Sequence, residues 1–137
     1  MALTPVTEID SDYDFEIQED ATETYRLNLE KDRVIGFTNN DLEAMKQAIY
    51  KIINTERYDY LIYSWNYGIE LNDLFGEPIP YVYSEIKRRI TEALTQDTRI
   101  ESVDAFSFEQ IKRGEVFVKF TAHTVYGDVT EGRKVNF

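Results

Sequence analysis

The sequence predicts an α+β domain in which a small, mostly antiparallel sheet is covered on one side by two main helices and a short helix. Two stretches, residues 40–53 and 81–95, repeat apolar side chains at helical spacing. Residues 116–126 alternate apolar and polar side chains, as a strand with one buried face does. A chain of 137 residues is long enough to bury one core, so we expect a single domain over residues 24–137.

Residues 1–23 are predicted to form an acidic arm outside that domain. The first 25 residues hold eight carboxylates and no Lys or Arg, and they carry most of the formal net charge of −11. Nucleic acid would repel such a chain, because phosphate binding needs a basic surface. The sequence shows neither a signal-peptide pattern nor an apolar run long enough to span a bilayer. We therefore expect synthesis in the cytoplasm and no nucleic-acid or membrane partner.

The arm contains a pattern that resembles the start of a calcium loop. Asp10, Asp12 and Asp14 follow the D-x-D-x-D spacing. However, the sixth position, which needs Gly, is Phe15, and the twelfth, which needs a bidentate Glu, is Ala21. A solvated tail, or an arm that docks its apolar edge on a neighbouring subunit, is the favoured interpretation. A calcium- or small-ligand-binding module is a weaker alternative.

A β-hairpin followed by a helix is expected over residues 24–53. Apolar and polar side chains alternate from Tyr25 onward, and Lys31 and Asp32 suit the turn. Asn39 or Asn40 can cap the helix, with Glu43 as the capping-box partner. The apolar stripe of this helix consists of Leu42, Met45, Ile49, Ile52 and Ile53.

The middle of the chain is predicted to be a strand, a tight turn and a short helix. Residues 57–63 are aromatic and apolar, which favours a strand, and Gly68 permits the turn. Residues 69–76 are expected to be helical, with their apolar side chains driven into the sheet. The structural motif of this region consists of Trp65, Tyr67, Gly68, Leu71, Leu74 and Phe75.

The remaining elements are a second helix and three strands. The helix spans about residues 81–95 and presents Val82, Ile86, Ile90, Ala93 and Leu94 on one face. Two long strands follow at 103–108 and 116–126, joined by a turn at 110–114. A short last strand is expected at 134–137.

Three carboxylates, Glu70, Asp73 and Glu77, raise the question of hydrolysis. On a helix they would share one solvated face, whereas a glycosidase needs two carboxyl groups on opposite sides of a bond, one of them desolvated. We therefore expect no catalytic residue, with hydrolysis by these carboxylates as the alternative. His123 is the only histidine and Cys is absent, so no zinc site of the usual kind can form. We expect an ordinary surface histidine, no metal and no cofactor.

The order of motifs in the second half of the chain resembles a known family. An aromatic–Gly–x–x–Leu–x–x–Leu–Phe run precedes an amphipathic helix, an Arg–Ile pair and two long strands. The run is Tyr67, Gly68, Leu71, Leu74 and Phe75, and the pair is Arg99 and Ile100. Over about residues 58–128 this order resembles the small baseplate wedge proteins of contractile phage tails, the sheath-initiating subunits once labelled lysozymes. Within that family the chain looks most like the versions from PBSX-type prophages of Bacillus.

The resemblance implies a structural protein rather than an enzyme. Such subunits resemble a shortened sheath protein, sit in several copies around the tail tube and offer sheet edges to strands of the first sheath ring. The implied partners are other baseplate wedge proteins and the tail sheath protein, in the tail baseplate of a phage-like particle. The isolated chain would be a monomer or a dimer. The alternative is a tail-associated peptidoglycan hydrolase that uses Glu70, Asp73 or Glu77.

The resemblance also implies a partner-binding site. The family usually carries Glu-Pro-Arg where this chain has Asp97, Thr98 and Arg99. In the family that motif helps to bind the other wedge subunits. We therefore expect Arg99, with Asp97 and Ile100, to contact a partner.

Overall fold

The structure is a computed structural model that describes residues 23–38 and 40–137. The predicted calcium-like loop and nearly all of the acidic arm lie outside the described residues. The elements, in chain order, are β1 (Tyr25–Asn28), β2 (Arg33–Phe37), α1 (Asp41–Ile53), the 3-10 helix η1 (Asn72–Leu74), α2 (Ile79–Thr95), β3 (Ile100–Lys112), β4 (Glu115–Thr124) and β5 (Gly127–Asn136). The predicted α+β class is confirmed.

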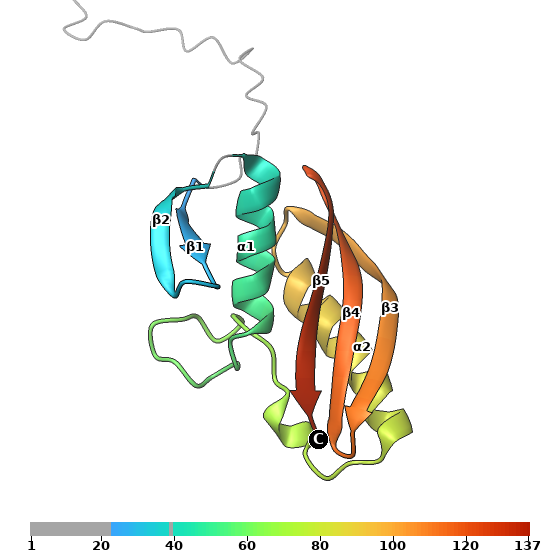
Figure 1. Cartoon of the computed structure of the whole chain (residues 1–137). Helices are drawn as coiled ribbons and strands as arrows, with labels where there is room; N and C mark the ends of the chain where they lie inside the picture. Colours follow the sequence, from blue (N-terminus) through green and yellow to red (C-terminus); the bar gives the residue numbers. More distant parts are fainter. Residues whose placement is uncertain (1–22, 39) are drawn as a thin grey trace, which may run out of the picture.

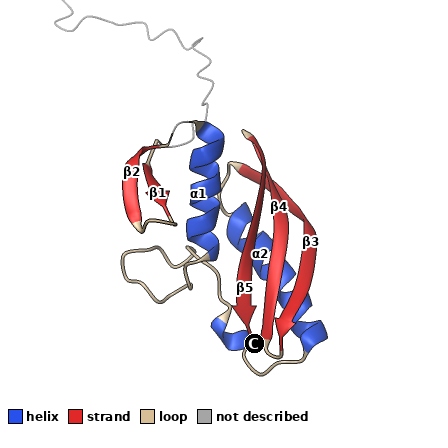
Figure 2. Ribbon diagram, viewed as in Figure 1, coloured by secondary structure: helices blue, strands red, loops and turns tan. Residues whose placement is uncertain are grey.

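The strands form two separate antiparallel sheets. β1 and β2 make a two-stranded hairpin, and β3, β4 and β5 make a three-stranded meander with β4 in the centre. Both helices lie on one face of the meander, and the hairpin lies on the far side of α1 (Figures 1 and 2). One face of the larger sheet therefore carries the core, and the other has no helix over it.

The core lies between the helices and the inner face of β4. Every second residue of β4 is buried, from Val116 to Thr124, as the alternation of the sequence predicts. All five predicted apolar residues of α2 are buried. In α1 the predicted stripe is buried except for Leu42, which stays at the surface beside Gly127. The side chains that are most completely buried include Phe120, Met45, Ile49, Ile53, Ile69, Leu74, Ile86, Ile90 and Leu94.

Local signals account for the start of α1. The side chain of Asn40 accepts a hydrogen bond from the backbone N–H of Glu43 at 2.8 Å, so the predicted cap forms. Acidic residues in the first turn and Lys51 in the last turn also suit the helix dipole. These end effects stabilise α1, which lies between the hairpin and β5 (Figure 1).

The prediction of a strand at residues 57–63 is wrong. This segment forms turns and bends, and the isolated bridge between Glu56 and Ile69 lies outside it on either side. Tyr58 has a φ of +72°, which an extended strand does not allow. The side chains of Leu61 and Ile62 point into solvent, so the apolar run is not the buried strand that its composition suggests.

Phe75 also departs from its prediction. Leu71 and Leu74 pack into the core as expected, but Phe75 is 78% exposed. The reason is that the short helix is a single 3-10 turn that ends at Leu74, and Phe75 then takes an extended backbone conformation. The last strand is longer than predicted, since β5 covers ten residues and ends at Asn136.

Candidate functional site

Asp97 and Arg99 form a compact ion pair at the junction of α2 and β3. The Asp97 carboxylate accepts hydrogen bonds from the Arg99 backbone N–H at 3.0 Å, from Nε at 2.9 Å and from Nη2 at 2.7 Å. The side-chain hydrogen bond from Arg99 holds the pKa of Asp97 below its ordinary value, against the opposing effect of burial. The two side chains are only about one-fifth exposed. The pair therefore presents a fixed arrangement of charges at the surface.

Two adjoining hollows border this pair, and they share Ile52, Tyr67 and Asp97. One measures about 230 Å³ and the other about 210 Å³. Residues that line the first are Ile52, Ser64, Asn66, Tyr67, Gly68, Ala93, Gln96 and Asp97. Residues that line the second are Thr24, Ala44, Gln47, Ala48, Lys51, Ile52, Tyr67, Asp97 and Arg99. The fold thus brings the predicted partner-binding pair together with Tyr67 and Gly68 of the structural motif.

The other predicted site residues lie in different surroundings. Ile100 is buried at the start of β3, in the core rather than at the surface. Trp65 is 82% exposed and lies outside both hollows. Burial and the neighbouring Tyr63, in that order, raise the pKa of the Tyr67 hydroxyl. Tyr67 lines both hollows and also stacks on Tyr63 of the preceding loop.

The three carboxylates of the hydrolase alternative are not arranged as a catalytic pair. Asp73 forms an ion pair with Arg89, whose guanidinium also donates to the backbone oxygen of Glu70 at 2.9 Å and to Glu85 at 3.0 Å. Glu70, Asp73 and Glu77 are all exposed. Asp73 and Glu70 thus serve to hold η1 against α2. In the described part of the chain, no group of three or more His, Cys, Asp or Glu side chains could hold a metal ion.

His123 has a role that the sequence did not predict. On the helix-free face of the sheet its ring lies between two carboxylates, with Nδ1 at 2.7 Å from Asp128 and Nε2 at 2.8 Å from Asp104. Hydrogen bonds to Asp128 and then to Asp104 raise the pKa of His123. The three residues come from β4, β5 and β3, so the cluster ties the three strands together. The separation of 19 positions between Asp104 and His123 hides it from sequence inspection.

The edge strands of the two sheets differ in whether their outward backbone N–H and C=O groups are available to another strand. The outer edge of β1 is occupied, because the amide of Gln47 donates to the Tyr25 backbone oxygen at 2.7 Å and accepts from the Leu27 N–H at 2.9 Å. β3 pairs with β4 through three register irregularities, at 100–102, 104–107 and 110–112. Such bulges blunt an edge.

β5 has the more regular edge. Its ten residues pair with β4 without a single register shift, from Gly127 opposite Thr124 to Asn136 opposite Glu115. The backbone N–H of Phe137 donates to Gly114 at 2.9 Å, which fixes the odd-numbered residues as those that bond to β4. The even-numbered residues from Asp128 to Lys134 therefore direct their N–H and C=O groups outward.

Comparison with known proteins decides to which family the chain belongs. The family model described as contractile injection system sheath initiator matches residues 7–127. The chain belongs to this sheath initiator family. It is also similar to a Bacillus subtilis (strain 168) protein described as phage-like element PBSX protein XkdS, with 39% identity over 134 residues, which cover 93% of this chain and 92% of that protein.

These findings confirm the resemblance inferred from the sequence, including its narrower form. A sheath initiator is a structural component of a contractile tail, and the relative from the PBSX element places the chain among phage-like tail proteins. None of the helices in residues 23–38 and 40–137 is both long and apolar enough to cross a membrane.

Proposed function

We propose that this sheath initiator is a wedge subunit of a phage-like tail baseplate and seeds the sheath by accepting an extended strand of the sheath protein at the edge of β5. The observation that carries the proposal is the unbroken ten-residue register of β5 with β4. An edge without register shifts offers a regular series of N–H and C=O groups, which is what strand addition requires. Several copies around the tail tube would offer the same edge to each subunit of the first sheath ring.

A groove beside β5 supports this choice of edge. It measures about 170 Å³ and is bounded by the hairpin, α1 and Glu131 of β5. Its lining residues are Arg26, Leu27, Leu29, Glu43, Lys46, Gln47, Tyr50 and Glu131. A strand laid along β5 would run beside this groove and over the exposed side of α1. Because Gln47 already occupies β1, that strand would bond to β5 alone.

Proline substitution at Thr130 tests the edge. Thr130 directs its N–H outward, so Thr130→Pro removes a donor for the incoming strand and leaves the pairing with β4 intact. Thr130→Ala is the matched control, because it removes the same side-chain contact with Thr121 and keeps the N–H. With purified cognate sheath protein, we expect the wild type and Thr130→Ala to shorten the lag of sheath polymerisation, and Thr130→Pro to do so far less. Equal seeding by both variants would rule out this edge, and no seeding by the wild type would rule out the function.

The Asp97–Arg99 pair and its two hollows are proposed as the contact with the other wedge subunits. Arg99 donates to Asp97 through Nε and Nη2, and the pair lies where two hollows meet. Arg99→Ala should leave a folded chain that no longer enters tails efficiently. The control is Arg113→Ala, since Arg113 is an exposed arginine in the turn between β3 and β4. Incorporation of Arg99→Ala at the level of Arg113→Ala would contradict this assignment.

The same family membership supports the proposal that the chain is not an enzyme. The ion pair of Asp73 with Arg89 and the exposed positions of Glu70 and Glu77 provide no desolvated acid. A cell-wall clearance assay distinguishes the two functions. We expect no lysis by the purified chain, whereas lysis that Glu70→Gln or Asp73→Asn abolishes would establish the hydrolase instead.

A further inference from the structure

Residues 58–67 form an exposed loop whose two ends are held by a dense set of hydrogen bonds. The backbone N–H of Ile69 donates to Thr55 at 3.0 Å, and that of Arg57 donates to Ile69 at 3.2 Å. The Arg57 guanidinium donates to the Gly68 backbone oxygen at 3.0 Å and to Glu92 at 3.1 Å. The carboxylate of Glu56 accepts the backbone N–H of Leu71 at 2.9 Å. The base of the loop is thus fixed on the core.

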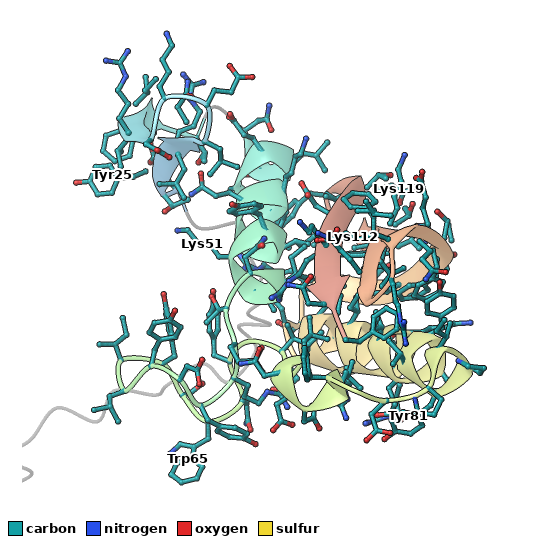
Figure 3. The ribbon with its side chains drawn as sticks, turned by 60° about the horizontal axis from the view of Figure 1, so that its bottom comes forward. Tyr25, Lys51, Trp65, Tyr81, Lys112 and Lys119 are labelled. Carbon is teal, nitrogen blue, oxygen red and sulfur yellow. The ribbon has the colours of Figure 1, made fainter. Side chains whose placement is uncertain are left out.

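The side chains that this base presents are mainly apolar and aromatic. Leu61 is fully exposed, Ile62 is 85% exposed and Trp65 is 82% exposed. Trp65 projects away from the body of the molecule (Figure 3). Contiguous apolar groups on a surface mark an interaction site, and a loop rich in Tyr, Trp, Ser and Asn has the composition of recognition loops. A rigid base under such groups indicates that the loop is built to contact another molecule.

The aromatic rings line an open hollow of about 320 Å³. Its lining consists of Tyr58, Tyr60, Leu61, Tyr63, Ser64 and Trp65. Tyr58 and Trp65 meet edge to face at 6.0 Å, and Tyr60 and Tyr63 do so at 6.1 Å. Tyr58 adopts a left-handed backbone conformation, with φ at +72°, to bring its ring to this position. Four aromatic rings thus converge on one site.

The charge around the hollow determines what it suits. Asp59 is the only charged residue from 58 to 69. The nearest arginine in the chain, Arg57, is almost buried and already bonded to Gly68 and Glu92. The loop therefore combines electron-rich ring faces with one free carboxylate and no free cation. A cationic side chain is the group that such faces attract.

We propose that this loop docks a basic segment of another protein, whose arginine or lysine enters the aromatic hollow while neighbouring apolar residues pack on Leu61 and Ile62. The proposal does not depend on the function of the β5 edge, which lies on other elements. It gives the loop a partner of definite chemistry: a positively charged, partly apolar protein segment that complements an acidic chain.

The chain contains its own probe for the test, because Trp65 is its single tryptophan. Trp65 emission from the full chain is followed while the acetylated and amidated peptide Ala-Leu-Arg-Leu-Ala is added. The matched peptide has citrulline, which is neutral and of similar shape, in place of arginine. We expect a saturable change in the millimolar range with the arginine peptide and about fivefold weaker binding of the citrulline peptide.

Variants of the full chain locate the site. Tyr60→Leu and Asp59→Asn should each weaken binding of the arginine peptide severalfold, and both residues are exposed, so melting temperature should not change. Tyr81→Leu, at an exposed tyrosine of α2, is the control and should bind like the wild type. Equal affinity for the two peptides, or no saturable change with either, would overturn the proposal. A Trp65 response to phosphatidylcholine vesicles without any response to the peptides would instead reassign the loop to a lipid surface.

Discussion

Replacement of Gly68 by alanine tests how strongly the fold depends on the base of the aromatic loop. Gly68 has a φ of +91°, and a Cβ at this position would lie 2.5 Å from the backbone oxygen of Thr55. Gly76 has a similar φ of +84°, but its Cβ would meet nothing within 4 Å. The two substitutions therefore share the cost of a left-handed alanine, about 1–2 kcal/mol, and differ in the collision.

The size of the difference follows from the hydrogen bonds near Thr55. To relieve the collision, the backbone at Gly68 must move away from the backbone at Thr55. This movement weakens the hydrogen bond from Ile69 to Thr55 and those from the Arg57 guanidinium to Gly68. A neutral hydrogen bond contributes about 1 kcal/mol and one to a charged group about 1.5–3 kcal/mol. We expect Gly68→Ala to lower the free energy of unfolding by about 2–4 kcal/mol more than Gly76→Ala does.

Urea unfolding of both variants and the wild type gives the measurement, with the slope checked for constancy so that the midpoints compare stability. For a chain of this size the melting temperature should also fall by about 4 °C for each kcal/mol. Trp65 emission reports at the same time whether the loop has changed. Equal loss of stability in the two alanine variants would refute the reasoning, because it would show that the loop base moves aside without cost.

Three further predictions follow from burial and charge. Leu74→Ala should cost about 2–5 kcal/mol, since Leu74 has no exposed surface, whereas Phe75→Ala should stay within about 0.5 kcal/mol; thermal unfolding compares them. His123 has a raised pKa in the folded chain, so its contribution to stability should be complete below its ordinary pKa of about 6.5 and should disappear as pH rises through the folded value. Unfolding of the wild type and His123→Gln across this pH range measures that contribution. Asp97 has a lowered pKa in the folded chain, so its contribution to stability should be complete above its ordinary pKa of about 3.8 and should be lost as pH falls through the folded value. Unfolding of the wild type and Asp97→Asn at several acidic pH values measures this loss, which the variant should not show.

The sequence predicted best those elements that repeat a simple pattern. α2 buries the five apolar residues that helical spacing selected, and Asn40 caps α1 through its side chain. β4 is central and has one buried face, so its alternation is complete. The length of β5 was underestimated because its inner face includes Glu131 and Arg133, which interrupt the apolar pattern between Val129 and Val135.

The segment at 57–63 shows why composition alone misled. An apolar, aromatic run fits a buried strand and an exposed recognition loop equally well, and periodicity does not separate them. The presence of Ser64 and Asn66 among the tyrosines, and the scarcity of valine and threonine, was the signal that favoured a loop. Whether the side chains would be covered depends on tertiary contacts that the segment itself does not encode.

The candidate site was predictable only in part. Asp97 and Arg99 came from the family resemblance, and the structure adds that they border two hollows with Tyr67. Those hollows join α1, the loop after it and the end of α2, so no single stretch of sequence reveals them. The open edge of β5 follows from its pairing with β4, which becomes visible only in the folded sheet.

The contact between α1 and β5 has a consequence for the order in which the chain folds. The Arg133 guanidinium, whose pKa is lowered by burial, donates to the backbone oxygen of Ile53, 80 positions earlier. α1 also packs against β5 and against α2, and it lies beside β5 in Figure 1. During synthesis the first helix therefore lacks part of its cover until the ten residues of β5 have been made. A nascent chain stalled before residue 127 should bind chaperones through α1, and the β5 edge would come into existence only with the completed fold.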